Sequence, residues 1–327
     1  MVDGGDAEDA EYRVLIKKYC QSLRTWCLCG EQSFSESWNI PNLRRTRMKV
    51  VLFCGGQGMR LREFSETIPK PMVNIGYRPI LWHVMKYYAH YGHNDFILCL
   101  GYAADFIKDY FLNYNECLSN DFVLRKGGKN LQLFNSDIDD WNITFADTGA
   151  TSNIGQRLKA VEKYLEGDDV FLANYSDGLT DVPLNDQIDH FTHEEKVASF
   201  LCVKPNLSCH FVTLNPDGVV EAIKDVTRSD IRINGGYFVF RKEIFQYMKD
   251  GEELLHEPFQ RLVQHEQLLA YKYDGFWAAM DTFKDKQMLD EIYERGQAPW
   301  QVWNHSSHSR HAPRVNRPSA RIVTSHQ

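Results

Sequence analysis

The stretch that decides the fold is Lys49–Pro79, KVVLFCGGQGMRLREFSETIPKPMVNIGYRP. It begins with a short run of apolar residues, Val50–Phe53, which predicts a strand buried on both faces of a parallel sheet. The run ends at Gly55-Gly56-Gln57-Gly58, and two cations, Arg60 and Lys70, follow. Glycines at the end of such a strand let backbone N–H groups approach an anion closely. The stretch therefore predicts a phosphate-binding turn.

Two better-known glycine motifs do not fit this stretch. A dinucleotide-binding fingerprint needs G-x-G-x-x-G and an acid about 20 residues later, but Asn74 and Ile75 stand at that distance. A Walker A loop needs G-x-x-x-x-G-K-[ST], and the nearest match, Gly128-Lys129, lacks the flanking residues. Neither NAD binding nor an ATPase P-loop is predicted. The open alternative is a plain glycine turn between a strand and a helix.

The overall charge excludes two classes of partner. With 37 Lys and Arg against 44 Asp and Glu, the 327-residue chain has a net charge of −7, which provides no general attraction for nucleic acid or an anionic membrane. No apolar run approaches the roughly 18 residues of a membrane span, and Met1–Ala10 is acidic, unlike the start of a signal peptide. We therefore expect a cytoplasmic protein that binds phosphate only locally.

Predicted helices and strands alternate after the glycine turn. Ile80–Tyr91 and Ala103–Tyr114 have apolar residues at helical spacing, and Phe96–Leu100 between them predicts a buried strand. This order predicts an α/β fold with a doubly wound, mostly parallel sheet and crossover helices. The shorter alternating runs of Phe122–Asp147 predict an antiparallel insertion, and the signals from Val197 onward are mostly those of strands.

The glycine turn is part of a longer pattern that extends to the first predicted helix. The pattern comprises Gly55–Leu61, Glu66-Thr67, Lys70–Val73, Gly76 and Pro79–Lys86. It resembles the N-terminal signature of the sugar-1-phosphate nucleotidylyltransferases, with the glucose-1-phosphate cytidylyltransferases as the nearest branch. The resemblance runs from about Met48 to Trp303, and it implies a Rossmann-like nucleotidyltransferase fold with a mixed sheet and a small antiparallel sugar-binding part. One departure is Met59, where the family usually has Thr.

The resemblance implies which residues bind the nucleotide. Arg60 and Lys70 would be the catalytic cations that hold the triphosphate. The segment Asp147–Leu158 matches the family pattern D-T-G-x-x-S-x-x-G-x-R-L, which lies beside the base and ribose. The implied nucleotide-binding residues are Gly55, Gly56, Gly58, Thr148, Gly149, Gly155 and Arg157. The segment also reads as a loop followed by a helix that Ser152 or Asn153 caps, and both interpretations can hold together.

A metal site is implied by two acids. Asp177 follows the predicted strand Val170–Asn174, and ligands in open α/β sheets bind at the carboxyl ends of the strands. An unpaired acid among phosphates makes sense only with a cation. Asp177 resembles a metal ligand of the family, and Asp281, in the W-x-x-M-D-T pattern, resembles the second, so the resemblance implies that Mg²⁺ binds to both. The alternative for Asp177-Gly178 is an ordinary turn.

The resemblance also implies a set of residues for the sugar phosphate. Asn234 and Gly235 stand in a stretch that resembles the family's N-G-G-F-F, Glu257 stands in its E-P, and Trp277 begins W-x-x-M-D-T. Lys224 lies close to the family's sugar-phosphate lysine, with a register that differs by about one residue.

The function that the resemblance implies is nucleotidyl transfer from an NTP to a hexose 1-phosphate, giving an NDP-sugar and pyrophosphate. CTP and glucose 1-phosphate are the expected substrates, and a homo-oligomer is expected. The alternatives are a catalytically silent relative that binds sugar nucleotides as a regulatory subunit, or the same reaction with dTTP, GTP or a heptose 1-phosphate. We expect residues 48–303 to form the nucleotidyltransferase domain, 1–47 to be an appended, weakly ordered segment, and 304–327 to be a disordered tail.

Overall fold

The computed structural model describes residues 46–56, 68–206 and 210–305. The predictions for the appended N-terminal segment up to residue 45 and for the tail from residue 306 lie outside these ranges. Within the described ranges, no helix is long and apolar enough to cross a bilayer.

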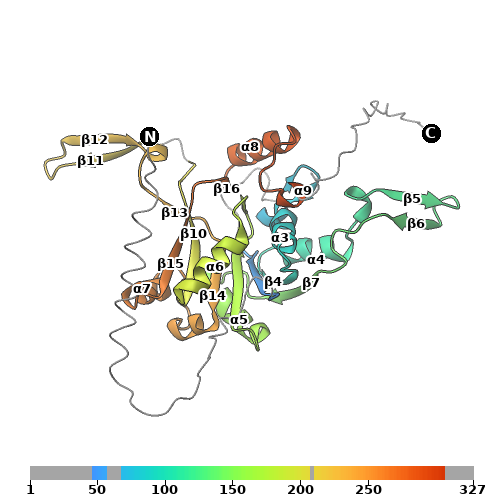
Figure 1. Ribbon diagram of the computed structural model, residues 1–327, viewed down its shortest axis with the longest axis horizontal. Helices are drawn as coiled ribbons and strands as arrows, with labels where there is room; N and C mark the ends of the chain where they lie inside the picture. The colour runs from blue at the N-terminus through green and yellow to red at the C-terminus, as the bar shows by residue number, and fades with distance from the viewer. Residues whose placement is uncertain (1–45, 57–67, 207–209, 306–327) are drawn as a thin grey trace, which may run out of the picture. The chain divides into compact units, whose positions relative to one another are not determined.

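A mixed sheet forms the centre of the fold (Figure 1). Its parallel part consists of β8 (Val170–Tyr175), β1 (Lys49–Phe53), β4 (Asp95–Leu100) and β7 (Asn142–Asp147), in that order. Strand β1 lies between β8 and β4, and four of its five residues are buried. The predicted central strand and the doubly wound parallel arrangement are confirmed.

The sheet continues beyond β8 with antiparallel pairing. Strand β14 (Phe238–Arg241) is antiparallel to β8, and β10 (Ala198–Val203) is antiparallel to β14. At its far side β10 also pairs in parallel with β15 (Leu268–Tyr273). Strand β13 (Ile233–Asn234) pairs with β10 just before β14 does, so β13 and β14 are one antiparallel strand that is interrupted at residues 235–237. This interruption borders the functional site.

The predicted antiparallel insertion is smaller than the sequence indicated. Only β5 (Phe122–Arg125) and β6 (Asn130–Leu133) form an antiparallel hairpin, whereas β7 joins the main sheet parallel to β4. The prediction was wrong for β7 because this strand is at the edge of the sheet and is mostly half-buried. A half-buried edge strand shows the same alternation of polar and apolar residues as an antiparallel strand.

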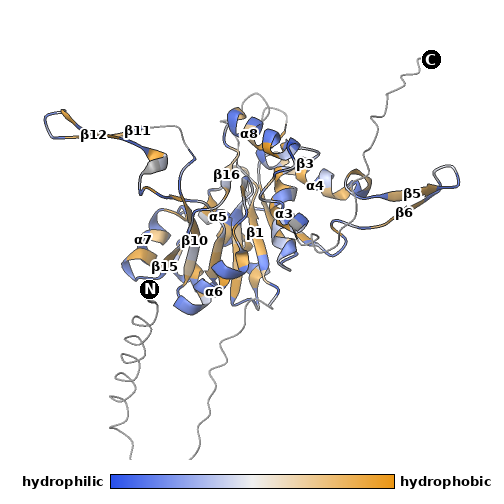
Figure 2. Ribbon diagram, turned by 45° about the horizontal axis from the view of Figure 1, so that its top comes forward, coloured by the Kyte–Doolittle hydropathy of each residue, from blue (hydrophilic) through white to orange (hydrophobic). Residues whose placement is uncertain are grey.

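The side chains of β1 alternate between two cores, one on each face of the sheet. Val50 and Leu52 point into the larger core, and Val51 and Phe53 into the smaller one. Figure 2 shows the hydrophobic colour concentrated on the strands between the covering helices. The larger core is covered by α3 (Ile80–His90), α4 (Ala104–Leu112) and α6 (Leu184–Glu194), and the smaller core by α5 (Ile154–Val161) and α7 (Glu257–Gln264).

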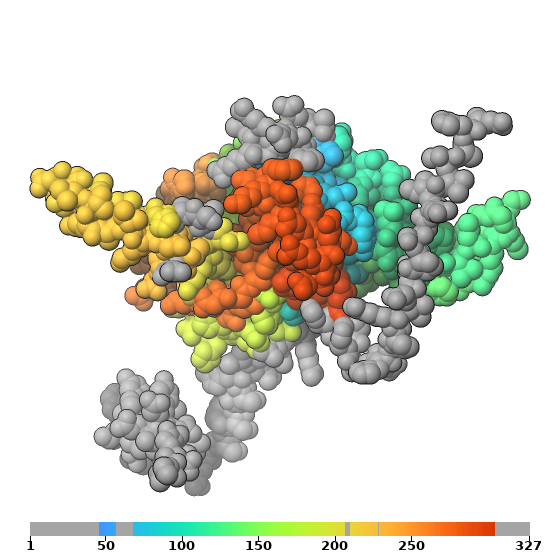
Figure 3. All heavy atoms as spheres, turned by 90° about the horizontal axis from the view of Figure 1, so that it is seen from above, coloured from blue at the N-terminus to red at the C-terminus, as the bar shows by residue number. Residues whose placement is uncertain are grey.

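The C-terminal part of the chain returns to the N-terminal part. Figure 3 shows it, in orange to red, against the cyan segment that contains α3. This part holds α8 (Phe283–Glu294) and α9 (Val302–His305), which contact the larger core. Three small antiparallel pairs complete the fold: β2 (Asn74–Ile75) with β3 (Arg78–Pro79), β9 (Gly178–Thr180) with β16 (Trp277–Ala279), and β11 (His210–Leu214) with β12 (Val220–Asp225).

Candidate active site

A cavity of about 460 Å³ opens at the carboxyl ends of β1 and β8, which is where ligands bind in open α/β sheets. We call it the pocket. Its walls are formed by Phe53–Gly56, Lys70, Pro71, Ser152–Ile154, Arg157, Asn174–Gly178, Ile233–Gly235, Glu253, Trp277, Ala279 and Asp281. The predicted site residues that the structure brings together here are Gly55, Gly56, Lys70, Arg157, Asp177, Asn234, Gly235, Trp277 and Asp281.

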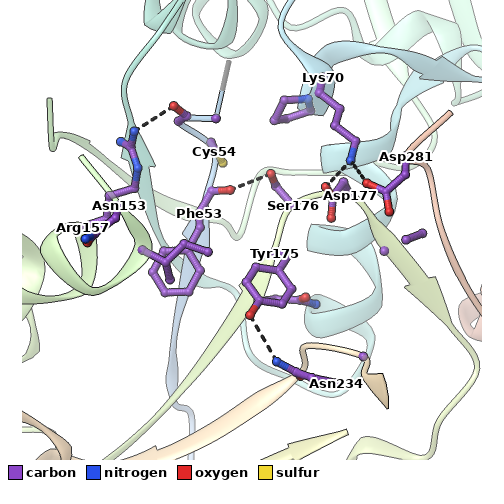
Figure 4. A pocket seen from close by; sticks show the side chains of 18 of the residues that line it. Phe53, Cys54, Lys70, Asn153, Arg157, Tyr175, Ser176, Asp177, Asn234 and Asp281 are labelled. Carbon is purple, nitrogen blue, oxygen red and sulfur yellow. Dashed lines mark hydrogen bonds and ion pairs between the residues drawn. The ribbon is translucent and has the colours of Figure 1, made fainter. Parts of the chain in front are cut away.

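Lys70 lies between the carboxylates of Asp177 and Asp281 (Figure 4). Its Nζ donates to Asp177 Oδ2 at 2.6 Å and to Asp281 Oδ1 at 2.7 Å. The Lys70 side chain is 15% exposed. Burial alone would lower the pKa of Lys70, but its interactions with the two carboxylates outweigh this effect and raise the pKa above its ordinary value. Lys70 is therefore a charged ammonium group at neutral pH.

The two acids meet because β9 pairs with β16. Asp177 directly precedes β9, Asp281 follows β16 after one residue, and the antiparallel register sets Gly178 opposite Ala279. Asp281 also precedes α8, whose N-terminus Thr282 caps by accepting a hydrogen bond from the backbone N–H of Asp285.

Lys70 extends from a short 3-10 helix, η3 (Lys70–Met72). Pro69 and Pro71 flank Lys70 and restrict the backbone on both of its sides. The N–H of Met72 donates to the carbonyl of Pro69 at 2.8 Å, and Pro71 is buried. The backbone of Lys70 is therefore held in place, while its four-carbon side chain reaches the acids.

The glycine turn requires Gly55 for a reason that the sequence did not reveal. Its carbonyl oxygen accepts a hydrogen bond from Arg157 Nη2 at 2.8 Å, and a Cβ at this position would lie 2.1 Å from Arg157 Nη1. Gly56 is exposed, and a Cβ there would meet nothing within 4 Å. Gly55 thus lacks a side chain because Arg157 packs against it, whereas Gly56 leaves the turn open toward solvent.

Arg157 joins the ends of three chain segments. Besides Gly55, its Nη1 donates to the carbonyl of Leu100 at 3.0 Å and to Thr148 Oγ1 at 2.7 Å. The residue is 3% exposed, and burial lowers the pKa of its guanidinium. Arg157 lines the pocket as predicted, but the hydrogen bonds it makes in the structure go to the protein, so it positions the glycine turn as well as adding positive charge.

The Asp147–Leu158 segment forms a loop followed by helix α5, as expected. Helix α5 begins with a capping box in which Asn153, one of the two residues that the sequence offered, is the cap. Thr148, Gly149 and Gly155 do not belong to the pocket wall. Gly155 instead packs against the backbone, since a Cβ there would lie 2.2 Å from the carbonyl oxygen of Glu252. The cap Asn153 and the first residue of α5, Ile154, line the pocket, and a helix N-terminus favours negative charge.

Three of the predicted sugar-binding residues lie in the pocket at the break between β13 and β14. Asn234 Nδ2 donates to the hydroxyl of Tyr175 at 3.3 Å, and Trp277 Nε1 donates to the carbonyl of Gly235 at 2.9 Å. The break depends on Gly236, whose φ of +75° favours glycine, and a Cβ there would lie 3.0 Å from both Asn174 Oδ1 and Tyr175 Cδ2. Polar groups and an aromatic ring therefore face the cavity together.

The structure does not place Lys224 or Glu257 in the pocket wall. Lys224 is exposed on β12, in a hairpin that pairs with no strand of the main sheet. Glu257 is exposed in the first turn of α7. Both assignments came from motif position alone, and the path of the backbone before each motif decides where its side chain lies. Glu253, which accepts a hydrogen bond from the N–H of Ile154 at 3.3 Å, lines the pocket instead.

Sequence reasoning missed several residues of the pocket wall besides Glu253. Asn174, Tyr175 and Ser176 directly follow the run Val170–Ala173, and their position at the end of that strand was the signal that could have found them. Ser176 Oγ donates to the carbonyl of Phe53 at 2.9 Å and so joins the ends of β8 and β1. Glu253 had no such signal, because it lies in a loop.

Two observations restrict the chemistry of the pocket. Cys54 lines it, but burial raises the pKa of its thiol to about 12, so Cys54 is no nucleophile at neutral pH. The described part of the chain contains no cluster of three or more His, Cys, Asp or Glu side chains that could hold a metal ion by themselves. A cation here would share Asp177 and Asp281 with a substrate. The predicted residues Gly58 and Arg60, and Met59 between them, lie outside the described residues.

Comparisons with known proteins agree with this geometry. The family model for nucleotidyl transferases matches residues 49–290. Two glucose-1-phosphate cytidylyltransferases, from Salmonella typhi and Salmonella typhimurium, are each 38% identical over 260 residues, which cover 78% of this chain and 100% of the relative. The structure of UTP-bound UGPase from Acinetobacter baumannii has the same fold, with a TM-score of 0.57 at 15% identity over 80% of this chain and 98% of that one. The predicted family and fold are therefore confirmed, and the chain belongs to the nucleotidyl transferase family.

Proposed function

We propose that the protein transfers a cytidylyl group from CTP to glucose 1-phosphate, which gives CDP-glucose and pyrophosphate. The observation that carries the proposal is that Lys70, Asp177 and Asp281 meet in the wall of the pocket that Gly55 and Gly56 also line. The choice of CTP and glucose 1-phosphate is supported by the names of the two relatives that are 38% identical.

The reaction needs positioning and charge more than it needs a base. A sugar phosphate is largely a dianion at neutral pH, so one of its oxygens can attack the α-phosphorus of the nucleotide directly. A new P–O bond forms, the bond between the α-phosphorus and the bridging oxygen breaks, and its electron pair leaves with pyrophosphate. Catalysis then depends on alignment and on cations close to the developing charge. Lys70 supplies one such cation, and we assign a second to Arg60.

The two carboxylates fit a divalent cation. Mg²⁺ prefers oxygen ligands and is usually bound through one or two carboxylates together with substrate phosphates and water. Asp177 and Asp281 provide this donor set, and Lys70 already marks a position of positive charge between them. When bound, Mg²⁺ would neutralise phosphate charge. Asp177 and Asp281 would hold it, while Asn234, Gly235 and Trp277 would contact the sugar.

A pyrophosphate-release assay tests the proposal. The protein is incubated with each of four NTPs (CTP, UTP, GTP and dTTP) and with glucose, mannose and heptose 1-phosphates. We expect the highest kcat/KM for CTP with glucose 1-phosphate. A preference for another base or sugar would contradict the assigned substrates but would leave nucleotidyl transfer as the reaction. If no pair released pyrophosphate but the protein bound CDP-glucose, the result would favour the second candidate, a catalytically silent relative that binds sugar nucleotides. The presence of Met59 where the family usually has Thr supports this second candidate.

We also propose that the protein is a homo-oligomer. The β5–β6 hairpin and the residue after it expose apolar side chains, including Leu124 (56%), Leu131 (47%) and Phe134 (61%). Leu124 pairs with Leu131 across the hairpin, so both lie on one face, and exposed apolar side chains grouped in this way are typical of an interface. Light scattering coupled to size-exclusion chromatography should give a mass above that of one 38.0 kDa chain. Leu124→Glu with Leu131→Glu should lower that mass if the hairpin contributes the interface.

A further inference from the structure

The ammonium group of Lys70 occupies the position that a cation shared by Asp177 and Asp281 would take. Its Nζ is 2.6 Å from one carboxylate and 2.7 Å from the other. Mg²⁺ binds carboxylate oxygens at about 2.0–2.1 Å, so an ion that bridges both acids lies in the same space. Two positive groups cannot share it, because their repulsion would be strong in a partly buried site.

We propose that Lys70 is a built-in competitor of the divalent cation. In the substrate-free protein its ammonium group neutralises Asp177 and Asp281. The carboxylates become available to the metal ion when Lys70 moves onto the phosphates of a bound nucleotide. This inference rests on the proposed function and adds an order of binding to it. The metal ion binds poorly alone and binds well together with the nucleotide, because the nucleotide phosphates draw Lys70 away from the acids.

The local structure allows the exchange at little cost. Pro69 and Pro71 restrict the backbone around Lys70, and the N–H of Met72 is bonded to the carbonyl of Pro69. Only the flexible four-carbon side chain has to move. Figure 4 shows Asp177 and Asp281 at the tip of the Lys70 side chain, with Cys54 and Arg157 farther to the left in the same pocket.

The arrangement also solves an electrostatic problem of the empty pocket. Two carboxylates at its wall would repel each other and the incoming nucleotide. The ammonium group of Lys70 neutralises the two carboxylates and so removes this repulsion as long as no metal ion is bound to them. The apparent affinity for metal equals the intrinsic affinity multiplied by the fraction of protein in which Lys70 is not bound to the acids.

Metal titration without any nucleotide tests the inference. Free Mn²⁺ is measured by electron paramagnetic resonance as it is added to the full-length protein and to Lys70→Met. We expect Lys70→Met to bind Mn²⁺ about tenfold more tightly than the unchanged protein. Lys70→Arg keeps the positive charge and should bind Mn²⁺ as poorly as the unchanged protein. Thermal melting checks that each variant is folded, and Lys70→Gln serves as a second neutral variant.

Two further variants assign the effect to this site. In Lys70→Met combined with Asp281→Asn, the gain in Mn²⁺ affinity should disappear. Lys86→Met is the matched control, because Lys86 also forms an ion pair with an acid, Asp137 at 3.3 Å, but does not line the pocket. Its affinity for Mn²⁺ should equal that of the unchanged protein.

The inference is overturned if neither neutral variant binds Mn²⁺ more tightly, if Lys70→Arg gains as much as Lys70→Met, or if the gain survives Asp281→Asn. These results are independent of turnover, since no NTP is present. If Lys70→Met bound Mn²⁺ tenfold more tightly but the unchanged protein released no pyrophosphate, the proposed function would be contradicted. The competition between Lys70 and the metal ion would still be supported.

Discussion

The backbone N–H of Met280 donates a hydrogen bond to the carbonyl oxygen of Asp177 at 2.9 Å. This bond extends the β9–β16 pairing by one step and sets Asp281 beside Asp177, although 104 positions separate them (281 − 177). Both side chains then face Lys70. The acids converge through backbone pairing, so substitutions of their side chains should change the chemistry without changing the local fold.

Asp177→Asn and Asp281→Asn should each lower kcat by about 100-fold or more, because each removes one ligand of a shared cation. The double variant should be little worse than either single variant, since the loss of one ligand already disables the ion. Steady-state kinetics with CTP, Mg²⁺ and glucose 1-phosphate measure this, with melting temperatures as the check on folding. Losses that multiply, or activity that persists in EDTA, would show that the two acids hold no common metal.

Lys70→Ala should lower kcat by more than it raises the KM for nucleotide, because a cation beside the leaving pyrophosphate acts mainly in the transition state. We expect the same of Arg60→Ala from its place in the family pattern. Initial rates over a range of CTP concentrations separate the two parameters. A change in KM alone would identify the residue as a binding contact that is equally strong in the ground state.

Gly55→Ala should disturb the glycine turn through Arg157. The added Cβ would lie 2.1 Å from Arg157 Nη1, and Arg157 is buried and bonded to three acceptors, so it cannot move away freely. We expect a loss of about 1–3 kcal/mol in the free energy of unfolding, together with weaker nucleotide binding. Gly56→Ala is the matched control for stability, because a Cβ there would meet no atom within 4 Å.

A double-mutant cycle shows whether that loss passes through Arg157. Arg157→Met removes the guanidinium, so Gly55→Ala should cost less stability in that background than in the unchanged protein. Urea denaturation of the four proteins gives the coupling free energy. Strictly additive losses would mean that the glycine is required for another reason.

Two buried histidines should make the protein less stable in mild acid. Burial lowers the pKa of His83 and of His93 to about 4, whereas both have a pKa near 6.5 when the chain is unfolded. The unfolded state therefore binds protons first, and stability present above pH 6.5 is lost as the pH falls toward 4. The expected loss is about 2 kcal/mol per histidine at pH 5.

Urea denaturation at pH 7 and pH 5 measures this loss. His93→Asn provides the control, because the Asn Oδ1 can still accept the hydrogen bond that the N–H of Met48 donates to His93 Nδ1 at 3.2 Å. The stability of this variant should depend less on pH. An equal dependence in both proteins would show that His93 does not contribute and would assign the acid sensitivity to His83 or to other groups.

Residues 46–305 should suffice for folding and turnover. Met48 is buried and bonded to His93, and the Trp303 ring lies 5.9 Å from that of Trp82 in a perpendicular contact. These contacts lie close to both ends of the range, and the domain of 48–303 expected from the sequence stays a prediction. A truncated protein of this length should keep the melting temperature and kcat/KM of the full chain. Loss of either would show that the flanking segments belong to the working enzyme.

The sequence by itself determined the fold class, the central strand and the identity of the charged residues at its end. Val50–Phe53 is apolar without interruption, and this composition is stable only in a strand that is covered on both faces. The glycines and Asp177 directly follow predicted strands, and Lys70 stands within the family pattern, so all of them can be found from their positions in the chain. Local signals of this kind suffice because the period of a helix or strand and the end of an apolar run are properties of neighbouring residues.

Tertiary structure alone decided which of these residues meet. The ion pairs of Lys70 join positions 107 and 211 residues apart, and they follow from the register of β9 with β16. Gly55 and Arg157 contact each other across 102 residues, which adds a packing requirement at a glycine that the sequence marked only as a phosphate contact. The pocket contains Glu253 in place of Glu257, and Lys224 lies on a separate hairpin. Contacts of this kind depend on strand register and loop path, which local sequence does not encode because they are fixed only when distant segments pack together.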